Sequence, residues 1–112
     1  MRIVNLKTFL EMPVGTVFQK YEPCVFSSFG IKAENVGNWD FYYQDLEQSI
    51  LCSGSDEEFF ILDESEKTGN SFRLDFDCMS RDGMFNDSQL FVVWEDGDVD
   101  YLIETLQNRK NI

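Results

Sequence analysis

Hydrophobic positions at the start of the chain repeat with helical spacing. Leu6, Phe9 and Leu10 follow Asn5, which is a typical helix N-cap residue. Pro13 cannot continue a helix and stops this one. The pattern predicts a short capped helix that covers the core.

The next part of the chain is rich in β-branched and aromatic residues, interrupted by turn-forming ones. The breaks lie at Glu22-Pro23, at Gly30 and at Gly37-Asn38. We expect three or four antiparallel strands here, from the segments 16–21, 25–29, 31–34 and 39–43.

A second helix is expected after residue 54. Ser55 with Glu58 three residues later matches a capping box, Phe59 and Leu62 supply an apolar stripe, and Gly69 ends the helix. An ion pair between Asp63 and Lys67 would support it, since the two residues are four apart.

The last third of the chain combines two strand patterns and one helical pattern. Strict alternation over 72–78 predicts a strand with Asp75 and Asp77 on its wet face, and the apolar run 90–94 predicts a central strand. Apolar residues at helical spacing then predict a final amphipathic helix; these are Val99, Leu102, Ile103 and Leu106. The fold class is therefore α+β: an antiparallel sheet of about four to six strands with three helices, in a single compact domain over residues 1–112.

Composition excludes several classes of protein. No apolar run approaches the roughly 18 residues of a membrane helix, so we expect a cytoplasmic protein without a membrane partner. The chain contains no histidine, which is the usual general base and a common metal ligand. The three cysteines form no Cys-x-x-Cys pair and are expected to be buried free thiols. No phosphate-binding glycine motif is present.

Charge is distributed very unevenly. Residues 1–44 carry four acids and four bases, whereas residues 45–112 carry seventeen acids and five bases. Such a surface repels nucleic acid and anionic membranes and attracts a basic protein. Duplex DNA presents roughly 20 charges over the diameter of about 34 Å expected for a domain of this length, and residues 45–108 have a net charge of −14. On one face these charges would approach those of DNA; spread over the surface they would serve solubility.

The segment from Asp96 to Asp100 has the alternate carboxylates of a calcium loop. Tyr101 stands where such a loop needs glycine, and Gln107 where it needs glutamate, so we expect no metal and no cofactor. Asp98 is instead predicted to be the N-cap of the last helix.

Acids that helix ends do not explain are candidates for binding a partner, together with two aromatic residues from the 39–43 segment. The candidate partner-binding residues are Asp45, Glu47, Asp63, Glu64, Asp75, Asp77, Asp82, Asp87, Glu95, Asp100, Glu104, Trp39 and Tyr42.

The opening stretch, from Leu6 through Pro13-Val14-Gly15-Thr16 to Phe18, resembles the start of small proteins encoded by bacteriophages and prophages. The resemblance covers the first quarter of the chain, and its motif is structural, so it carries over no functional residue. Small acidic phage proteins that block host defence, including anti-CRISPR and anti-restriction inhibitors, often resemble DNA in charge. The resemblance implies a non-enzymatic inhibitor in the cytoplasm of a bacterial host.

The partner expected on this basis is a basic, nucleic-acid-binding host protein, bound through DNA mimicry and without direct contact to nucleic acid. One alternative is an adaptor or regulatory module that binds a protein through an exposed aromatic surface. A carboxylate-dependent and metal-dependent enzyme is the third interpretation. A homodimer is compatible with each of them.

Overall fold

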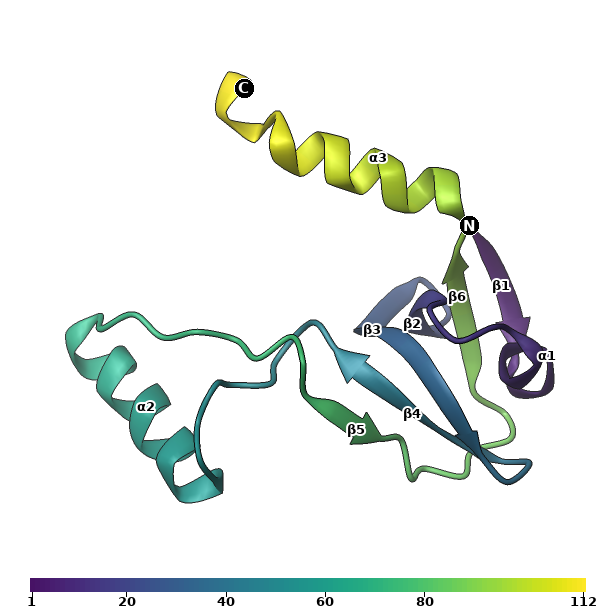
Figure 1. Ribbon diagram of the computed structural model, residues 1–112, viewed down its shortest axis with the longest axis horizontal. Coiled ribbons are helices and arrows are strands. Elements are labelled where there is room, and N and C mark those ends of the chain that lie inside the picture. The colour runs from purple at the N-terminus through teal and green to yellow at the C-terminus, as the bar shows by residue number, and fades with distance from the viewer.

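The fold is a single antiparallel sheet with three helices, which confirms the α+β class (Figure 1). The computed structural model describes all 112 residues. Six strands lie in the order β1-β6-β2-β3-β4-β5, so that β6, the predicted 90–94 strand, is an interior strand as expected. The strands are β1 (Arg2–Asn5), β2 (Val17–Glu22), β3 (Val25–Val36), β4 (Asp40–Asp45), β5 (Met79–Arg81) and β6 (Leu90–Trp94). The helices are α1 (Leu6–Glu11), α2 (Ser55–Thr68) and α3 (Asp96–Gln107), followed by a short 3-10 turn, η1 (Arg109–Asn111).

The core lies between α1 and one face of the sheet. The predicted cap of α1 is confirmed, because the Asn5 carboxamide accepts a hydrogen bond from the backbone N–H of Thr8 at 2.9 Å. Phe9 of α1 stacks on Phe91 of β6 with ring centroids 4.1 Å apart, and Phe18 and Phe41 surround the pair. Only 11 of the 112 residues are buried.

The expected strand break at Gly30 is wrong, because β3 runs through it without interruption. A Cβ atom at Gly30 would lie 2.8 Å from the carbonyl oxygen of Gln44 and 3.1 Å from the ring of Tyr43. The glycine is therefore required for close approach between β3 and its neighbours, and the other two breaks, at Pro23 and Gly37, are real turns.

The strand predicted for residues 72–78 is also wrong. Only Leu74 makes an isolated bridge there, to Ile50, and the adjacent strand is Met79–Arg81 instead. The carboxylate of Asp75 accepts a hydrogen bond from the backbone N–H of Asp77 at 2.9 Å, which is a local turn that competes with extended pairing. Asp75 and Asp77 therefore do not share a strand face.

Helix α2 ends as predicted but begins differently. Gly69 closes it in the left-handed conformation (φ 76°), and Lys67 pairs with Asp63 at 2.9 Å. The predicted Ser55–Glu58 capping box is absent, since Gly54 is the N-cap and makes no side-chain bond. Glu57 instead accepts hydrogen bonds from the backbone N–H and the hydroxyl of Ser53.

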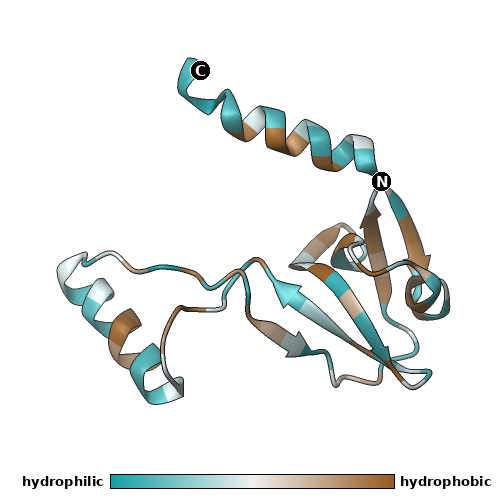
Figure 2. Ribbon diagram, viewed as in Figure 1, coloured by the Kyte–Doolittle hydropathy of each residue, from teal (hydrophilic) through white to brown (hydrophobic).

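Both longer helices project from the sheet and bury none of their residues (Figure 1). The radius of gyration is consequently 16.0 Å, with overall dimensions of 44 × 39 × 25 Å. A compact chain of this length would have a radius of gyration of about 13 Å, so the two projecting helices make this domain more extended than its length indicates. Figure 2 shows hydrophobic bands on both projecting helices.

The cysteines are free, as expected, but they are not buried: Cys24 is exposed and Cys52 and Cys78 are half-buried. None of the helices is both long enough and apolar enough to span a membrane.

Candidate functional site

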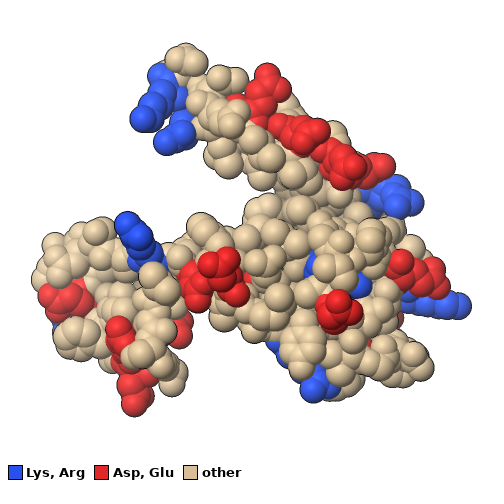
Figure 3. Space-filling model, viewed as in Figure 1, with Lys and Arg blue, Asp and Glu red and all other residues tan.

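The acidic excess of the chain is concentrated on α2 and α3, which we call the two arms. The arms hold ten acids and one base, Lys67. In Figure 3 acidic side chains follow one edge of α3 and occur again on α2, and a further acidic cluster lies between α2 and the sheet. The structure therefore divides the acids between two projecting helices and does not gather them on one flat face.

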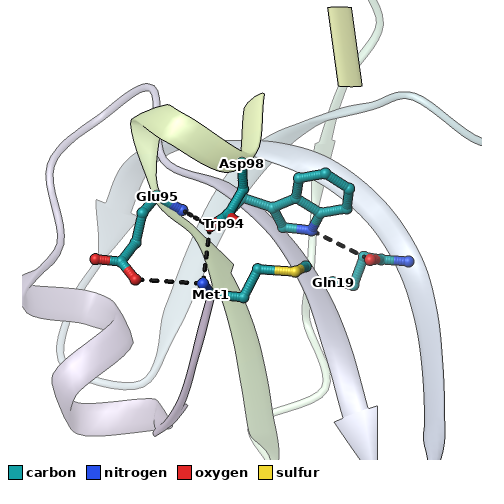
Figure 4. A network of polar contacts seen from close by, with 5 residues as sticks. All are labelled: Met1, Gln19, Trp94, Glu95 and Asp98. Atoms are coloured by element: carbon teal, nitrogen blue, oxygen red, sulfur yellow. Dashed lines mark hydrogen bonds and ion pairs between the residues drawn. The ribbon is translucent and has the colours of Figure 1, made fainter. Parts of the chain in front are cut away.

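The base of α3 is held by the N-terminal ammonium group (Figure 4). The nitrogen of Met1 lies 2.8 Å from Asp98 Oδ2 and 3.2 Å from Glu95 Oε1. Glu95 is the N-cap, and Asp98, at the third helical position, completes a capping box by accepting the backbone N–H of Glu95 at 2.9 Å. The prediction that Asp98 is itself the N-cap is thus wrong by three positions.

These contacts change the ionisation of both groups. The hydrogen bond from the Met1 ammonium group, followed by that from the Glu95 backbone, lowers the pKa of Asp98. The same ion pair raises the pKa of the Met1 ammonium group. Glu95 and Asp98 are therefore committed to the start of the helix, and Glu95 is less available to a partner than its sequence position indicated.

The acids of α3 that remain free lie beside an apolar stripe. Asp100 and Glu104 are exposed and make no side-chain hydrogen bond or ion pair. The neighbouring Ile103 and Leu106 are 49% and 53% exposed. The final amphipathic helix is confirmed, but its apolar side faces no core.

Large aromatic residues are also exposed on α2. Phe59 is 74% exposed and Phe60 66%, and Leu62 beside them is exposed as well. The sequence pattern placed Phe59 with Leu62 in an apolar stripe and did not single out Phe60. Adjacent helical residues point about 100° apart, so the four consecutive apolar residues from Phe59 to Leu62 span most of the helix circumference and cannot all face one core. This signal was present in the sequence.

Three of the candidate acids make internal contacts instead. Asp82 forms an ion pair with Lys20 at 2.6 Å and its side chain is only 9% exposed, so it is not free to bind a partner. Asp45 accepts the backbone N–H of Glu47 at 2.8 Å and the hydroxyl of Ser49 at 3.1 Å. The carboxylate of Glu47 in turn accepts the backbone N–H of Phe29.

The other candidate acids are engaged in fewer internal contacts. Asp63 is paired with Lys67, and Glu64 accepts a hydrogen bond from the side chain of Asn70 at 3.3 Å. Asp75 and Asp77 lie on the connection between α2 and β5.

Trp39 and Asp87 both line a cavity of about 530 Å³ beside α1. Trp39, in the turn before β4, is 57% exposed there. Tyr42 is exposed as well but does not line this cavity; across the sheet its partner in β5 is Arg81. The exposed aromatic pair expected from the sequence is thus split between two places. The lining consists of Asn5, Leu6, Lys7, Leu10, Glu11, Asn35, Gly37, Asn38, Trp39 and Asp87.

A buried charge that the sequence did not reveal lies at Asp40. Its side chain is fully buried and accepts hydrogen bonds from Arg81 and from the backbone N–H groups of Gly83 and Phe41. Burial alone would raise the pKa of Asp40, but these hydrogen bonds outweigh it and lower the pKa. The arrangement ties the start of β4 to the end of β5.

No three potential metal-ligating side chains lie close enough together to hold an ion. The exposed, chemically distinctive features of the chain are therefore the two arms and the cavity at Trp39. Comparison with protein-family models, with curated proteins and with solved structures finds no match for this chain.

Proposed function

We propose that this chain is a non-enzymatic inhibitor that binds a basic, nucleic-acid-binding protein through its two acidic arms. The observation that carries the proposal is that ten of the 21 acids lie on helices that project from the sheet and bury no residue. A cationic groove would attract such helices over a distance of about 10 Å at 0.1 M salt.

The arms also supply what a purely anionic surface lacks. Interface cores are enriched in aromatic residues and depleted of charge, and Phe59 and Phe60 are exposed among the acids of α2. We expect acids to steer the encounter and apolar side chains to slow dissociation. Nucleic acid and this chain would then compete for one cationic surface.

An adaptor that binds through aromatic residues alone is the second candidate, and the exposure of Phe59, Phe60 and Trp39 favours it. The two functions differ in their response to salt. Competition by DNA and weakening at high salt are expected of the inhibitor, whereas an aromatic adaptor is expected to be nearly indifferent to both.

The test uses the immobilised chain and a bacterial lysate freed of nucleic acid by nuclease treatment. A retained protein is purified, and its affinity is measured at about 50 and 200 mM salt and with duplex DNA as competitor. One variant neutralises three acids of the arms (Glu66→Gln, Asp100→Asn, Glu104→Gln). The matched control neutralises three exposed acids elsewhere (Glu11→Gln, Glu22→Gln, Glu34→Gln), which changes the net charge equally.

We expect the arm variant to bind at least roughly tenfold more weakly, mostly through slower association, and the control to bind as before. If both variants lost affinity equally, the loss would follow from the change in net charge and not from the position of the acids on the arms. Insensitivity of the natural chain to salt and DNA would support the adaptor instead.

A further inference from the structure

The apolar side of α3 is uncovered. Val99, Leu102, Ile103 and Leu106 share one side of the helix at i, i+3, i+4 and i+7, yet none of them is buried. Figure 1 shows α3 leading away from the sheet, with its far end at the C-terminus. The apolar side is therefore accessible along most of the helix.

The solvent-accessible surface of the whole chain is larger than that of a compact protein of the same mass. Its accessible surface is 7976 Å². A compact protein of 13.1 kDa would expose about 6,400 Å². The difference of about 1,600 Å² exceeds the roughly 800 Å² that each partner contributes to a stable interface, so the chain has enough surplus surface for such an interface.

The charges of α3 are ordered along its length. Asp96, Asp98 and Asp100 lie in its first half, and Arg109 with Lys110 follow its end. Two such helices side by side in the same direction would place acids against acids. In opposite directions the acidic start of one would face the basic end of the other, which is the complementary arrangement.

We propose that α3 binds α3 of a second copy of this chain, antiparallel, around a two-fold axis that passes between Leu102 and Ile103. A two-fold interface is self-complementary, so each contact occurs twice. With the axis at this point Val99 faces Leu106, and Leu102 faces Ile103. The apolar positions of one helix thus face the apolar positions of the other.

The same axis also pairs the charges. Asp96 lies at the same height as Arg109 beside the apolar contact, and no acid of α3 lies at the same height as another acid. The other pairs at equal height are Glu95 with Lys110, Asp98 with Gln107 and Asp100 with Thr105, whereas Tyr101 and Glu104 point away from the apolar side. The occupant is therefore a second copy of the chain, favoured by both its apolar pattern and its charge order.

The first experiment measures the mass of the full chain by sedimentation equilibrium from low micromolar concentration to about 500 μM. We expect a monomer–dimer equilibrium. Replacing Ile103 and Leu106 together by Glu should weaken the dimer roughly a hundredfold, because apolar burial is lost and charge is forced into the contact. The matched control replaces the equally exposed Val14 and Leu51, which lie outside α3, by Glu, and should dimerise like the natural chain.

The second experiment tests direction. Asp96→Arg and Arg109→Asp each place like charges opposite one another in their own dimers, and each should weaken the dimer roughly tenfold. Mixing the two variants should restore the natural affinity, since every pair in the mixed dimer is again complementary. Helix stability cannot explain restoration, because each chain is the same alone and in the mixture.

A monomer at all concentrations would overturn the proposal. So would a dimer that survives the Ile103/Leu106 variant or is lost equally in the control. A mixture that dimerises no better than its separate components would overturn the antiparallel arrangement. None of these outcomes bears on binding to a basic protein, which the lysate experiment tests separately.

Discussion

Arg81 and Asp40 form an ion pair in which the carboxylate is fully buried and the guanidinium group is half exposed, with Arg81 Nε 2.5 Å from Asp40 Oδ2. The guanidinium group also lies over the ring of Phe85, 5.8 Å from its centroid. This pair holds the short strand β5 against β4 at the edge of the sheet.

Replacing Arg81 with Ala should lower the free energy of unfolding by about 2 kcal/mol at pH 7. Removal of one partner from a fully buried pair costs about 3 to 5 kcal/mol, and the exposure of the guanidinium group reduces this. The variant also removes the hydrogen bond that helps to lower the pKa of Asp40. Urea denaturation at pH 7 gives the difference.

The pH dependence of the stability loss in the Arg81→Ala variant tests whether the loss comes from the ion pair with Asp40. In the natural chain the pKa of Asp40 is lowered, so its contribution to stability is present above the unfolded pKa and is lost as pH falls through the folded pKa. In the variant burial acts with less opposition, and the Asp40 carboxyl group binds a proton at higher pH. The free energies of unfolding of the natural chain and the variant should therefore differ less at pH 4 than at pH 7. An equal difference at both pH values would contradict the ionic explanation.

Acetylation of the Met1 amino group should weaken the start of α3. The pKa of this ammonium group is raised above its ordinary value of 8.0 by the Asp98 hydrogen bond. Its stabilising contribution is therefore complete below that value and is lost as pH rises through the higher folded pKa. Hydrogen exchange of the Val99 amide should become faster in the natural chain at alkaline pH, relative to its intrinsic rate. In the acetylated chain it should be fast already at pH 7 and show no such transition.

Gly30→Ala should destabilise the fold by about 2 kcal/mol, because the new Cβ atom would lie 2.8 Å from a backbone oxygen that cannot move freely. Gly54→Ala is the matched control, since a Cβ atom there meets nothing within 4 Å and its φ of 174° is ordinary extended backbone. Thermal unfolding of the two variants should separate them clearly. Similar losses would indicate that glycine flexibility, and not close approach, matters at Gly30.

Phe9→Ala should lower the free energy of unfolding by about 3 to 5 kcal/mol, because Phe9 is completely buried among other aromatic rings. Phe59→Ser on α2 should change it by less than about 0.5 kcal/mol, since Phe59 is 74% exposed. Chemical denaturation measures both. A large loss at Phe59 would show that the arm packs on the rest of the chain in solution.

Local patterns predicted those elements whose stabilising contacts are close in sequence. Asn5 caps α1 and Gly69 ends α2 through hydrogen bonds within four residues, as the sequence predicts. The alternation over 72–78 indicated only that the segment could form a strand. A strand also needs a free neighbouring edge, and the edge of β4 is occupied by Met79–Arg81.

The sequence predicted that the candidate site is acidic, but not where its acids lie in the fold. Charge counting identified an acidic region, and the structure assigns ten of its acids to two projecting helices. Asp82 could not be distinguished from a free acid, because its partner Lys20 lies far away in sequence. The N-cap was assigned to Asp98 because Glu95 and Asp98 form a reciprocal capping box three residues apart, in which either acid resembles the cap. The contact between Asp98 and the ammonium group of Met1 forms only in the folded chain.

The projection of α3 makes its helical order depend on what binds it. A helix of about 12 residues is only marginally stable in water without tertiary contacts, and α3 has its anchor at one end only, at Met1. Part of the free energy of any association at α3 is therefore used to hold the far turns helical. Affinity should consequently respond to intrinsic helix propensity at positions that touch no partner. Gly97, whose Cβ would meet nothing within 4 Å, is such a position, and alanine there should strengthen association by forming the helix in advance.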